Sequence, residues 1–416
     1  MIGIICEYDP FHKGHLYQIR QAKYMAGKEG LDPSVICVMS PNFVQRSSPA
    51  FYDKYTRTRM ALSGGANLVL ELPAYYATAT AEKFAFGGAK LLQESGLVDS
   101  ISFGMEDPSA LPLLDKAAEY LANPSAGYTD LLKKNLEIYP SFAKARLGAL
   151  ETLTGAELPD EPNAILVLEY LHACKQLSFS PALLPVKRSV PHNFGSDPST
   201  ARSNAAGPSP SLQNQHPFVS ASFIRETART GGEISDFLPF PVNQHPAFLE
   251  DIYPAIRYRL CFHSADTLAG IDEISEGLEN RILHSAPIST DYTSLLHLLE
   301  TKRYPTARLR RILLNIYLDI TKEKKKALKF EQGPSYLRVL GVRKDSLSLL
   351  SRLKKEAGLP VLINYPDDTA SLSQEGRWML EEELRFGKLY QSLMRRDEEG
   401  QHTLPESEYQ IPLQII

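Results

Sequence analysis

Short apolar runs alternate with amphipathic segments through the first half of the chain. Five runs are brief, rich in β-branched residues and bounded by turn formers, as buried strands are, at residues 2–6, 35–39, 68–72, 100–103 and 183–186. Helical patterns lie between them at residues 15–27, 53–63, 79–95, 110–122 and 163–176. This alternation predicts an α/β fold with a Rossmann-like parallel sheet covered by helices on both faces.

The pattern changes near residue 235. Residues 236–416 are mostly helical in pattern, with a small β-α-β unit at 336–342, 347–357 and 360–363. Before the change, residues 189–219 are dominated by Ser, Pro, Asn, Gly and His, which predicts a mobile surface loop. Because single cores stop growing at about 250–300 residues, we predict two domains, 1–235 and 236–416.

Composition excludes several classes of protein. Hydrophobic residues make up 43% and charged residues 23% of the 416 residues, as in an ordinary globular chain. We find neither a signal-peptide pattern nor an uncharged apolar run near the roughly 18 residues of a membrane helix. We therefore predict a cytoplasmic protein with no membrane partner. The four cysteines form no C-x-x-C pair, which favours buried free thiols over a metal or disulfide role.

Charge is distributed unevenly along the chain. Residues 301–360 carry 16 Lys and Arg against 5 Asp and Glu, a local net charge of +11, although the whole chain has −4. A basic segment of this kind is often a solvated helix face. Its strength here favours contact with a polyanion through Lys302, Arg303, Arg308 and Arg311.

The segment His12-Lys13-Gly14-His15 follows the first predicted strand and opens the first predicted helix. Free N–H groups at a helix start favour phosphate, and two imidazoles there add donors that can stabilise charge during attack at an α-phosphorus. Gly14 allows close approach to the backbone. The alternative is a pair of surface histidines at a helix cap, but their position after the first strand favours the catalytic interpretation.

A second candidate element contains Ser220, Ser222 and Arg225. Two hydroxyls followed by an arginine one turn later can cap a helix and bind phosphates together. Alone, this pattern would favour a plain helix cap with a solvent-facing arginine. The presence of the H-x-G-H segment in the same chain favours phosphate binding instead.

Together the two elements resemble the H-x-G-H and I-S-x-T-x-x-R signatures of the nucleotidyltransferase superfamily. The chain further resembles the bacterial tRNA(Met) cytidine acetate ligase family, in the right order over nearly its whole length, at Asn42-Phe43-Val44-Gln45-Arg46, Glu71-Leu72-Pro73, Phe103-Gly104, Pro162-Asn163, Lys187-Arg188 and Thr301-Lys302-Arg303-Tyr304. The resemblance implies that acetate attacks ATP to give acetyl-adenylate and pyrophosphate. The acetyl group then passes to N4 of the wobble cytidine of elongator tRNA(Met).

The resemblance also implies a set of functional residues. His12 and His15 would be catalytic. ATP would be bound by Glu7, Tyr8, Asp9, Pro10, Phe11, His12, Lys13, Gly14, His15, Leu16, Tyr17, Gln18, Ile19, Arg20, Gly104, Asn163, Arg188, Ser220, Ser222 and Arg225. Gln45 and Arg46 would face the acceptor, while Lys302, Arg303, Arg308 and Arg311 would contact tRNA. Mg²⁺ is expected to accompany ATP, and no all-protein metal site is visible in the sequence.

Several alternatives remain open at this point. Arg46 could instead form a structural ion pair with Asp53 or Glu71. Phe11 and Phe43 are candidates for the walls of an acetate pocket, with loop anchoring as the other interpretation. The chain departs from the family pattern at Pro41, which puts the substrate-side loop in doubt. Two other functions compete: adenylyl transfer to a phosphorylated small molecule, and nucleotide or RNA binding without catalysis.

Overall fold

The computed structural model describes residues 1–139, 142–188, 218–275, 277–301, 304–364, 367–394 and 408–416. One eight-stranded sheet organises the molecule, in the order β10-β8-β5-β2-β1-β6-β7, with β9 paired to β8. The strands are β1 (Ile2–Cys6), β2 (Val35–Met39), β5 (Leu68–Glu71), β6 (Ser100–Met105), β7 (Ala182–Lys187), β8 (Leu337–Val342), β9 (Val361–Leu362) and β10 (Gln414–Ile415). The five strands of the first half run parallel, and β8 is antiparallel to β5. The predicted Rossmann-like α/β fold is confirmed.

Alternate residues of each central strand enter two separate apolar cores, one on each face of the sheet. On β2, for example, Ile36 and Val38 belong to one core, whereas Cys37 and Met39 belong to the other. Helices α1 (Lys13–Lys28) and α2 (Lys54–Ser63) contribute to the second core. The first core contains residues of α3 (Ala74–Ala77), α4 (Ala81–Glu94), α5 (Leu111–Ala122) and α8 (Pro162–Gln176).

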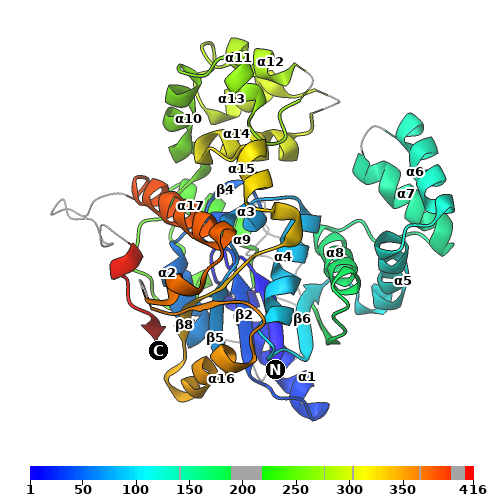
Figure 1. Ribbon diagram of the computed structural model, residues 1–416, viewed down its shortest axis with the longest axis vertical. Coiled ribbons are helices and arrows are strands. Elements are labelled where there is room, and N and C mark those ends of the chain that lie inside the picture. Colours follow the sequence, from blue (N-terminus) through cyan, green and yellow to red (C-terminus); the bar gives the residue numbers. More distant parts are fainter. Residues whose placement is uncertain (140–141, 189–217, 276, 302–303, 365–366, 395–407) are drawn as a thin grey trace.

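Two features of the first half lie outside the predicted pattern. Strands β3 (Phe43–Val44) and β4 (Ser48–Pro49) form a short antiparallel hairpin after β2. Helices α6 (Ala126–Ile138) and α7 (Phe142–Thr154) pack on each other and project from the sheet, as the right side of Figure 1 shows. The predicted mobile loop at residues 189–219 falls almost wholly outside the described residues.

The second half divides between a helical lobe and the sheet. The lobe at the top of Figure 1 contains α10 (Tyr253–Leu260), α11 (Ala265–Ala269), α12 (Leu278–Ser285), α13 (Tyr292–Leu299), α14 (Thr306–Leu318) and α15 (Lys322–Ala327). The chain then returns to the sheet through β8, α16 (Ser348–Glu356) and β9, which form the predicted β-α-β unit. Helix α17 (Gln374–Gln391) and β10 follow.

The apolar core on the α4 side is shared between the two halves of the chain. It contains Leu70 of β5, Phe84 of α4, Leu313 of α14 and Val339 of β8. The sheet and this core therefore both draw residues from the two sides of residue 235. A division into domains at that residue stays a prediction. Among the described residues, no helix combines the length and apolar character needed to span a membrane.

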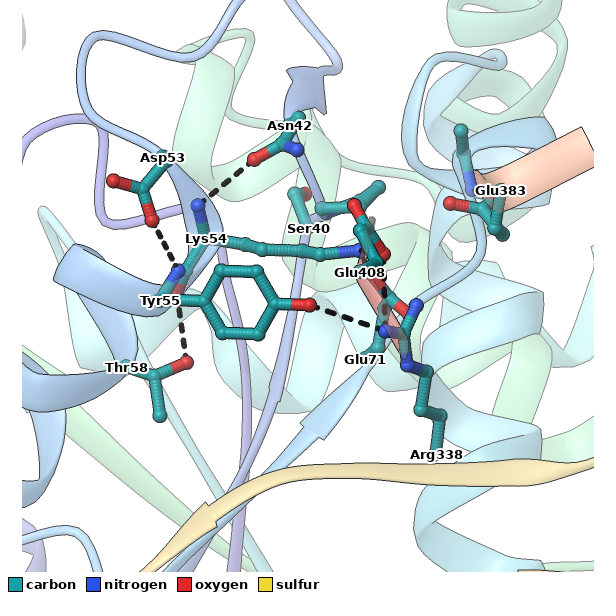
Figure 2. A network of polar contacts seen from close by, with 12 residues as sticks. Ser40, Asn42, Asp53, Lys54, Tyr55, Thr58, Glu71, Arg338, Glu383 and Glu408 are labelled. Carbon is teal, nitrogen blue, oxygen red and sulfur yellow. Dashed lines mark hydrogen bonds and ion pairs between the residues drawn. The ribbon is translucent and has the colours of Figure 1, made fainter. Parts of the chain in front are cut away.

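A buried ionic network, made of Lys54, Glu71, Arg338 and Glu408, joins segments that are far apart in sequence (Figure 2). Lys54 Nζ lies 2.6 Å from Glu71 and 2.8 Å from Glu408, and Arg338 lies 2.8 Å and 3.0 Å from the same two carboxylates. None of the four side chains is more than 3% exposed. The network fixes the segment before β10 to α2, β5 and β8.

Candidate active site

The carboxyl ends of the parallel strands surround one cavity, where ligands bind in sheets of this type. Most of the predicted site residues line it: Glu7, Tyr8, Asp9, His12, His15, Gln18, Gln45, Arg46, Gly104, Asn163, Arg188, Ser220, Ser222 and Arg225. These residues come from the loop after β1 and from α1, from the turn between β3 and β4, from the end of β6, from the start of α8, from the residue after β7, and from α9 (Ala221–Arg229) with the residue before it. The fold thus brings together positions separated by more than half of the chain.

The two histidines are held by the start of α1. Nδ1 of His12 accepts the N–H of Gly14 at 3.0 Å, and Nδ1 of His15 accepts the N–H of His12 at 3.3 Å. The two rings stack with centroids 3.9 Å apart. Because each Nδ1 accepts a hydrogen bond, each neutral ring carries its hydrogen on Nε2. Each histidine can therefore donate one hydrogen bond to a phosphate oxygen.

The electrostatic environment keeps both histidines neutral. Burial lowers the pKa of His12 to about 3, with further lowering by the positive charges of Arg188 and Arg225. Burial also lowers the pKa of His15 well below its usual value, helped by His12 and Arg188. The site therefore supplies two neutral donors and two guanidinium groups in one cavity, a combination suited to a phosphate chain.

Gly14 is required by the histidine geometry itself. A Cβ on this residue would lie 2.7 Å from Cε1 and 3.0 Å from Nδ1 of His12. Real Cβ atoms do not approach ring atoms this closely, so any side chain would displace the His12 ring from its capping position. The sequence had suggested only that Gly14 gives a nucleotide room.

Helix α9 and the loop after β1 contact each other where both line the cavity. Ser220 caps α9 by accepting the N–H of Phe223 at 3.2 Å. Arg225 donates to Ser222 Oγ at 3.2 Å and to the main-chain oxygen of Asp9, and lies 3.3 Å from the Asp9 carboxylate. Asp9 therefore holds Arg225 at the cavity. This contact joins the two predicted elements, although Asp9 and Arg225 are 216 residues apart.

One residue that the sequence did not suggest is Glu106, directly after β6. Its Oε1 accepts a hydrogen bond from Asn163 Nδ2 at 2.5 Å and lies 3.7 Å from Arg188 Nε. Glu106 thus contacts two residues that are predicted to bind ATP. Among the described residues, Glu106 Oε2 and Arg188 Nε are both buried without a hydrogen-bond partner. The only signal in the sequence was an acidic residue two positions after Gly104.

Several residues of the stretch 7–20 face away from the cavity. Gly14 and Tyr17 line an adjoining hollow together with Gln18, Gly104 and Arg188. Six residues line neither space: Pro10, Phe11, Lys13, Leu16, Ile19 and Arg20. The helical period accounts for this, because α1 turns Ile19 into the core and Arg20 to solvent. An ATP-binding role for these six side chains stays a prediction.

Of the two interpretations of Phe11 and Phe43, the structure favours loop anchoring over the walls of an acetate pocket, because both are fully buried and neither lines the cavity. Phe11 packs against Tyr8 with ring centroids 4.8 Å apart, and Phe43 packs 6.0 Å from Tyr317. The apolar walls come instead from Phe84, Phe103, Leu166, Val167 and Tyr170. These residues lie on α4, β6 and α8 and carry no local motif.

The structure describes two of the four residues that are predicted to contact tRNA. Lys302 and Arg303 lie outside the described residues. Arg311 Nε lies 2.8 Å from the Glu273 carboxylate, and Arg308 donates to the main-chain oxygen of Glu273 at 2.9 Å. Both arginines are therefore engaged within the helical lobe, and a tRNA contact would have to compete with Glu273.

Arg46 lines the cavity, as predicted from its place after β2. The two carboxylates considered as its structural partners have other bonds. Asp53 caps α2 through the N–H groups of Tyr55 and Thr56, and Glu71 belongs to the buried ionic network. A substrate-facing role for Arg46 stays a prediction that this placement supports.

Known proteins resemble this chain over most of its length. The chain matches the family model described as HIGH Nucleotidyl Transferase over residues 1–404. A tRNA(Met) cytidine acetate ligase of Acetivibrio thermocellus is 34% identical over 402 residues, which cover 94% of each chain. The chain belongs to the tRNA(Met) cytidine acetate ligase family.

Other members of the ligase family support the same assignment. The enzyme of Caldanaerobacter subterraneus is 36% identical over 377 residues, covering 87% of this chain and 88% of its own. A crystal structure of Thermotoga maritima TmcAL bound with alpha-thio ATP superposes with a TM-score of 0.85 at 27% identity, covering 100% of this chain and 99% of that one. The family resemblance predicted from sequence is confirmed.

Proposed function

We propose that this ligase joins acetate to the α-phosphorus of ATP in its cavity and then acetylates N4 of the wobble cytidine of elongator tRNA(Met). The observation that carries the proposal is the meeting of His12, His15, Arg188 and Arg225 in one cavity at the carboxyl edge of the sheet. Neutral imidazole donors and fixed cations match the charge of a nucleoside triphosphate. Membership of the ligase family supplies the acceptor.

The first half-reaction follows from this arrangement. An acetate oxygen attacks the α-phosphorus, and the bond to pyrophosphate breaks as negative charge builds on the phosphate oxygens. His12 and His15 donate to the α-phosphate, while Arg225 with Ser222 and the start of α9 hold the leaving pyrophosphate. Mg²⁺ arrives with ATP as part of the substrate.

Adenosine and the acceptor use the rest of the cavity. Gly104, Asn163 and Arg188 bind the nucleoside, and Gln45 with Arg46 faces the acceptor. The proposal places tRNA on the helical lobe through Lys302, Arg303, Arg308 and Arg311. The local net charge of +11 in residues 301–360 supports this side for a polyanion.

The decisive experiment follows acetate-dependent exchange of labelled pyrophosphate into ATP, and then analyses the nucleosides of treated elongator tRNA(Met) by mass spectrometry. We expect exchange that requires acetate, and N4-acetylcytidine at the wobble position only. Adenylyl transfer to a phosphorylated small molecule is the competing function. Exchange driven by such a molecule and not by acetate would favour that competitor.

A further inference from the structure

Two carboxylates line the reaction cavity, counted over the described residues, and they differ in how fully they are engaged. Asp9 is fully occupied. One of its oxygens accepts the N–H of Phe51 at 2.5 Å, and the other lies 3.3 Å from Arg225. The role of Asp9 is therefore to position Arg225. If the Asp9 carboxylate took up a proton, its interaction with Arg225 would weaken.

Glu7 is held in place but keeps one oxygen available. Its Oε1 accepts the N–H of Gln45 at 2.6 Å, and its main-chain oxygen accepts from Arg57 at 2.6 Å. Within the described part of the chain, Oε2 has no hydrogen-bond partner and is not closed off from the cavity. Glu7 thus presents one unshared oxygen to the space that His12 and His15 also line.

The groups around Glu7 raise its pKa and so make its carboxylate a stronger proton acceptor. Burial and the nearby negative charge of Asp9 raise the pKa of Glu7, while the positive charges of Arg46 and Arg225 and the Gln45 N–H oppose this rise. Tyr170 faces it from α8 and has its own pKa raised, chiefly by burial. A carboxylate with a raised pKa is a stronger base than a solvated one.

The two half-reactions make different demands on a base. Acetate attacks ATP as an anion, so the first step releases no proton. The cytidine amine is neutral and carries two hydrogens, so one proton must leave when its nitrogen bonds to the acetyl carbon. A base that faces the cavity is therefore needed in the second step alone.

We infer that Glu7 accepts the proton of the attacking cytidine amine during acetyl transfer, an inference that rests on the proposed function. The N4 lone pair forms a bond to the acetyl carbonyl carbon. The bond from that carbon to the phosphate oxygen breaks, and AMP leaves with the electron pair. The N4 proton passes to Glu7 Oε2 and from there to water when the products depart.

The test uses Glu7→Gln, which keeps an oxygen to accept the Gln45 N–H but removes the basic oxygen. Acetyl transfer from preformed acetyl-adenylate to tRNA should slow by about 10²–10⁴, the range for loss of a general base. Acetate-dependent pyrophosphate exchange should fall far less. Asp9→Asn serves as the matched control and should impair exchange, because it releases Arg225.

The pH dependence gives an independent readout. In the parent enzyme the transfer rate should rise with pH until Glu7 is ionised and then level off. Glu7→Gln should lack this rise, and Glu7→Asp, which retains a carboxylate, should show it at a shifted pH. The Glu7→Asp profile also carries the test if the Gln variant folds poorly.

Four results would count against the inference. Equal loss of exchange and transfer in Glu7→Gln would make Glu7 an ATP-site residue, and an undiminished transfer rate would exclude it as the base. A rise with pH that persists in Glu7→Gln would place the base elsewhere. If the parent protein shows no acetate-dependent exchange, the proposed function itself fails and the role of Glu7 fails with it.

Discussion

Replacement of Arg338 by methionine probes what holds the C-terminal segment to the sheet. The Arg338 side chain is 3% exposed and donates to Glu71 at 2.8 Å, to Glu408 at 3.0 Å and to the Tyr55 hydroxyl at 3.2 Å. After Arg338→Met, Lys54 is the single remaining cation of the network, facing two buried carboxylates. One buried negative charge is left without compensation.

The uncompensated carboxylate charge sets the size of the expected loss of stability. Removing one partner of a buried ionic network costs about 3–5 kcal/mol of the free energy of unfolding, because the remaining charge stays desolvated. The loss should depend on pH. In the variant, a carboxylate escapes by binding a proton, so its folded-state pKa rises and the deficit grows as pH rises. In the parent, paired cations lower the pKa of Glu71, so its contribution is lost instead as pH falls.

Urea unfolding followed by fluorescence or circular dichroism measures the free energy of unfolding of the parent and of Arg338→Met at pH 7 and pH 5. Arg343→Met is the matched control, because Arg343 pairs with Asp345 at the surface, where the two side chains are 33% and 59% exposed. That exposed pair is worth about 0–1 kcal/mol. If Arg338→Met costs no more than Arg343→Met, or costs more at pH 5 than at pH 7, the reasoning is refuted.

Three further predictions concern the reaction and the tRNA. His12→Ala and His15→Ala should each slow adenylate formation by about 10²–10³, the range for loss of one fixed donor, and parental pyrophosphate exchange in either variant would contradict its assignment. Glu106→Gln should raise the KM for ATP more than it lowers kcat, because Glu106 positions Asn163 and Arg188, which are predicted to bind ATP. Glu106→Asp should restore part of the lost ATP affinity, and an effect on kcat alone would contradict this role. Charge reversal at Arg308 and Arg311 should weaken tRNA binding and make it less dependent on salt concentration, while pyrophosphate exchange is unchanged. If tRNA affinity is unchanged and the melting temperature of the protein falls, these arginines only stabilise the helical lobe.

The strands and helices that could be predicted are those whose signal is local. Strands β1 and β2 were predicted with their observed bounds because buried parallel strands form short continuous apolar runs. Helix α6 was not predicted, since only Tyr128 among its residues is fully buried and its apolar stripe is correspondingly narrow. Strand β8 was recognised, but its pairing with β5 was not, because that pairing joins residues about 270 positions apart and leaves no local pattern.

The residues of the candidate site also divide into those with a local sequence signal and those without one. His12 and His15 could be predicted because the residues that position them are their own neighbours in sequence. Glu106 and the apolar walls could not, because each is a single residue that gains its role only when α4, α8 and β6 meet. Phe11 was a candidate for the pocket wall because of its position in the loop, but its ring turns into the core beside Tyr8. Proximity along the chain located the loop and did not fix the direction of its side chains.

The late position of Glu408 and β10 in the sequence bears on how the sheet is completed during synthesis. Glu408 supplies a carboxylate to Lys54 and Arg338, and β10 pairs with β8 in the last few residues of the chain. While the ribosome still holds those residues, Gly341 and Val342 of β8 lack their partner strand β10, and Lys54 and Arg338 lack one of their two carboxylates. Unpaired strand edges of this kind invite association between chains. A nascent or truncated chain that lacks residues 408–415 would thus leave part of the β8 edge and one side of the ionic network exposed.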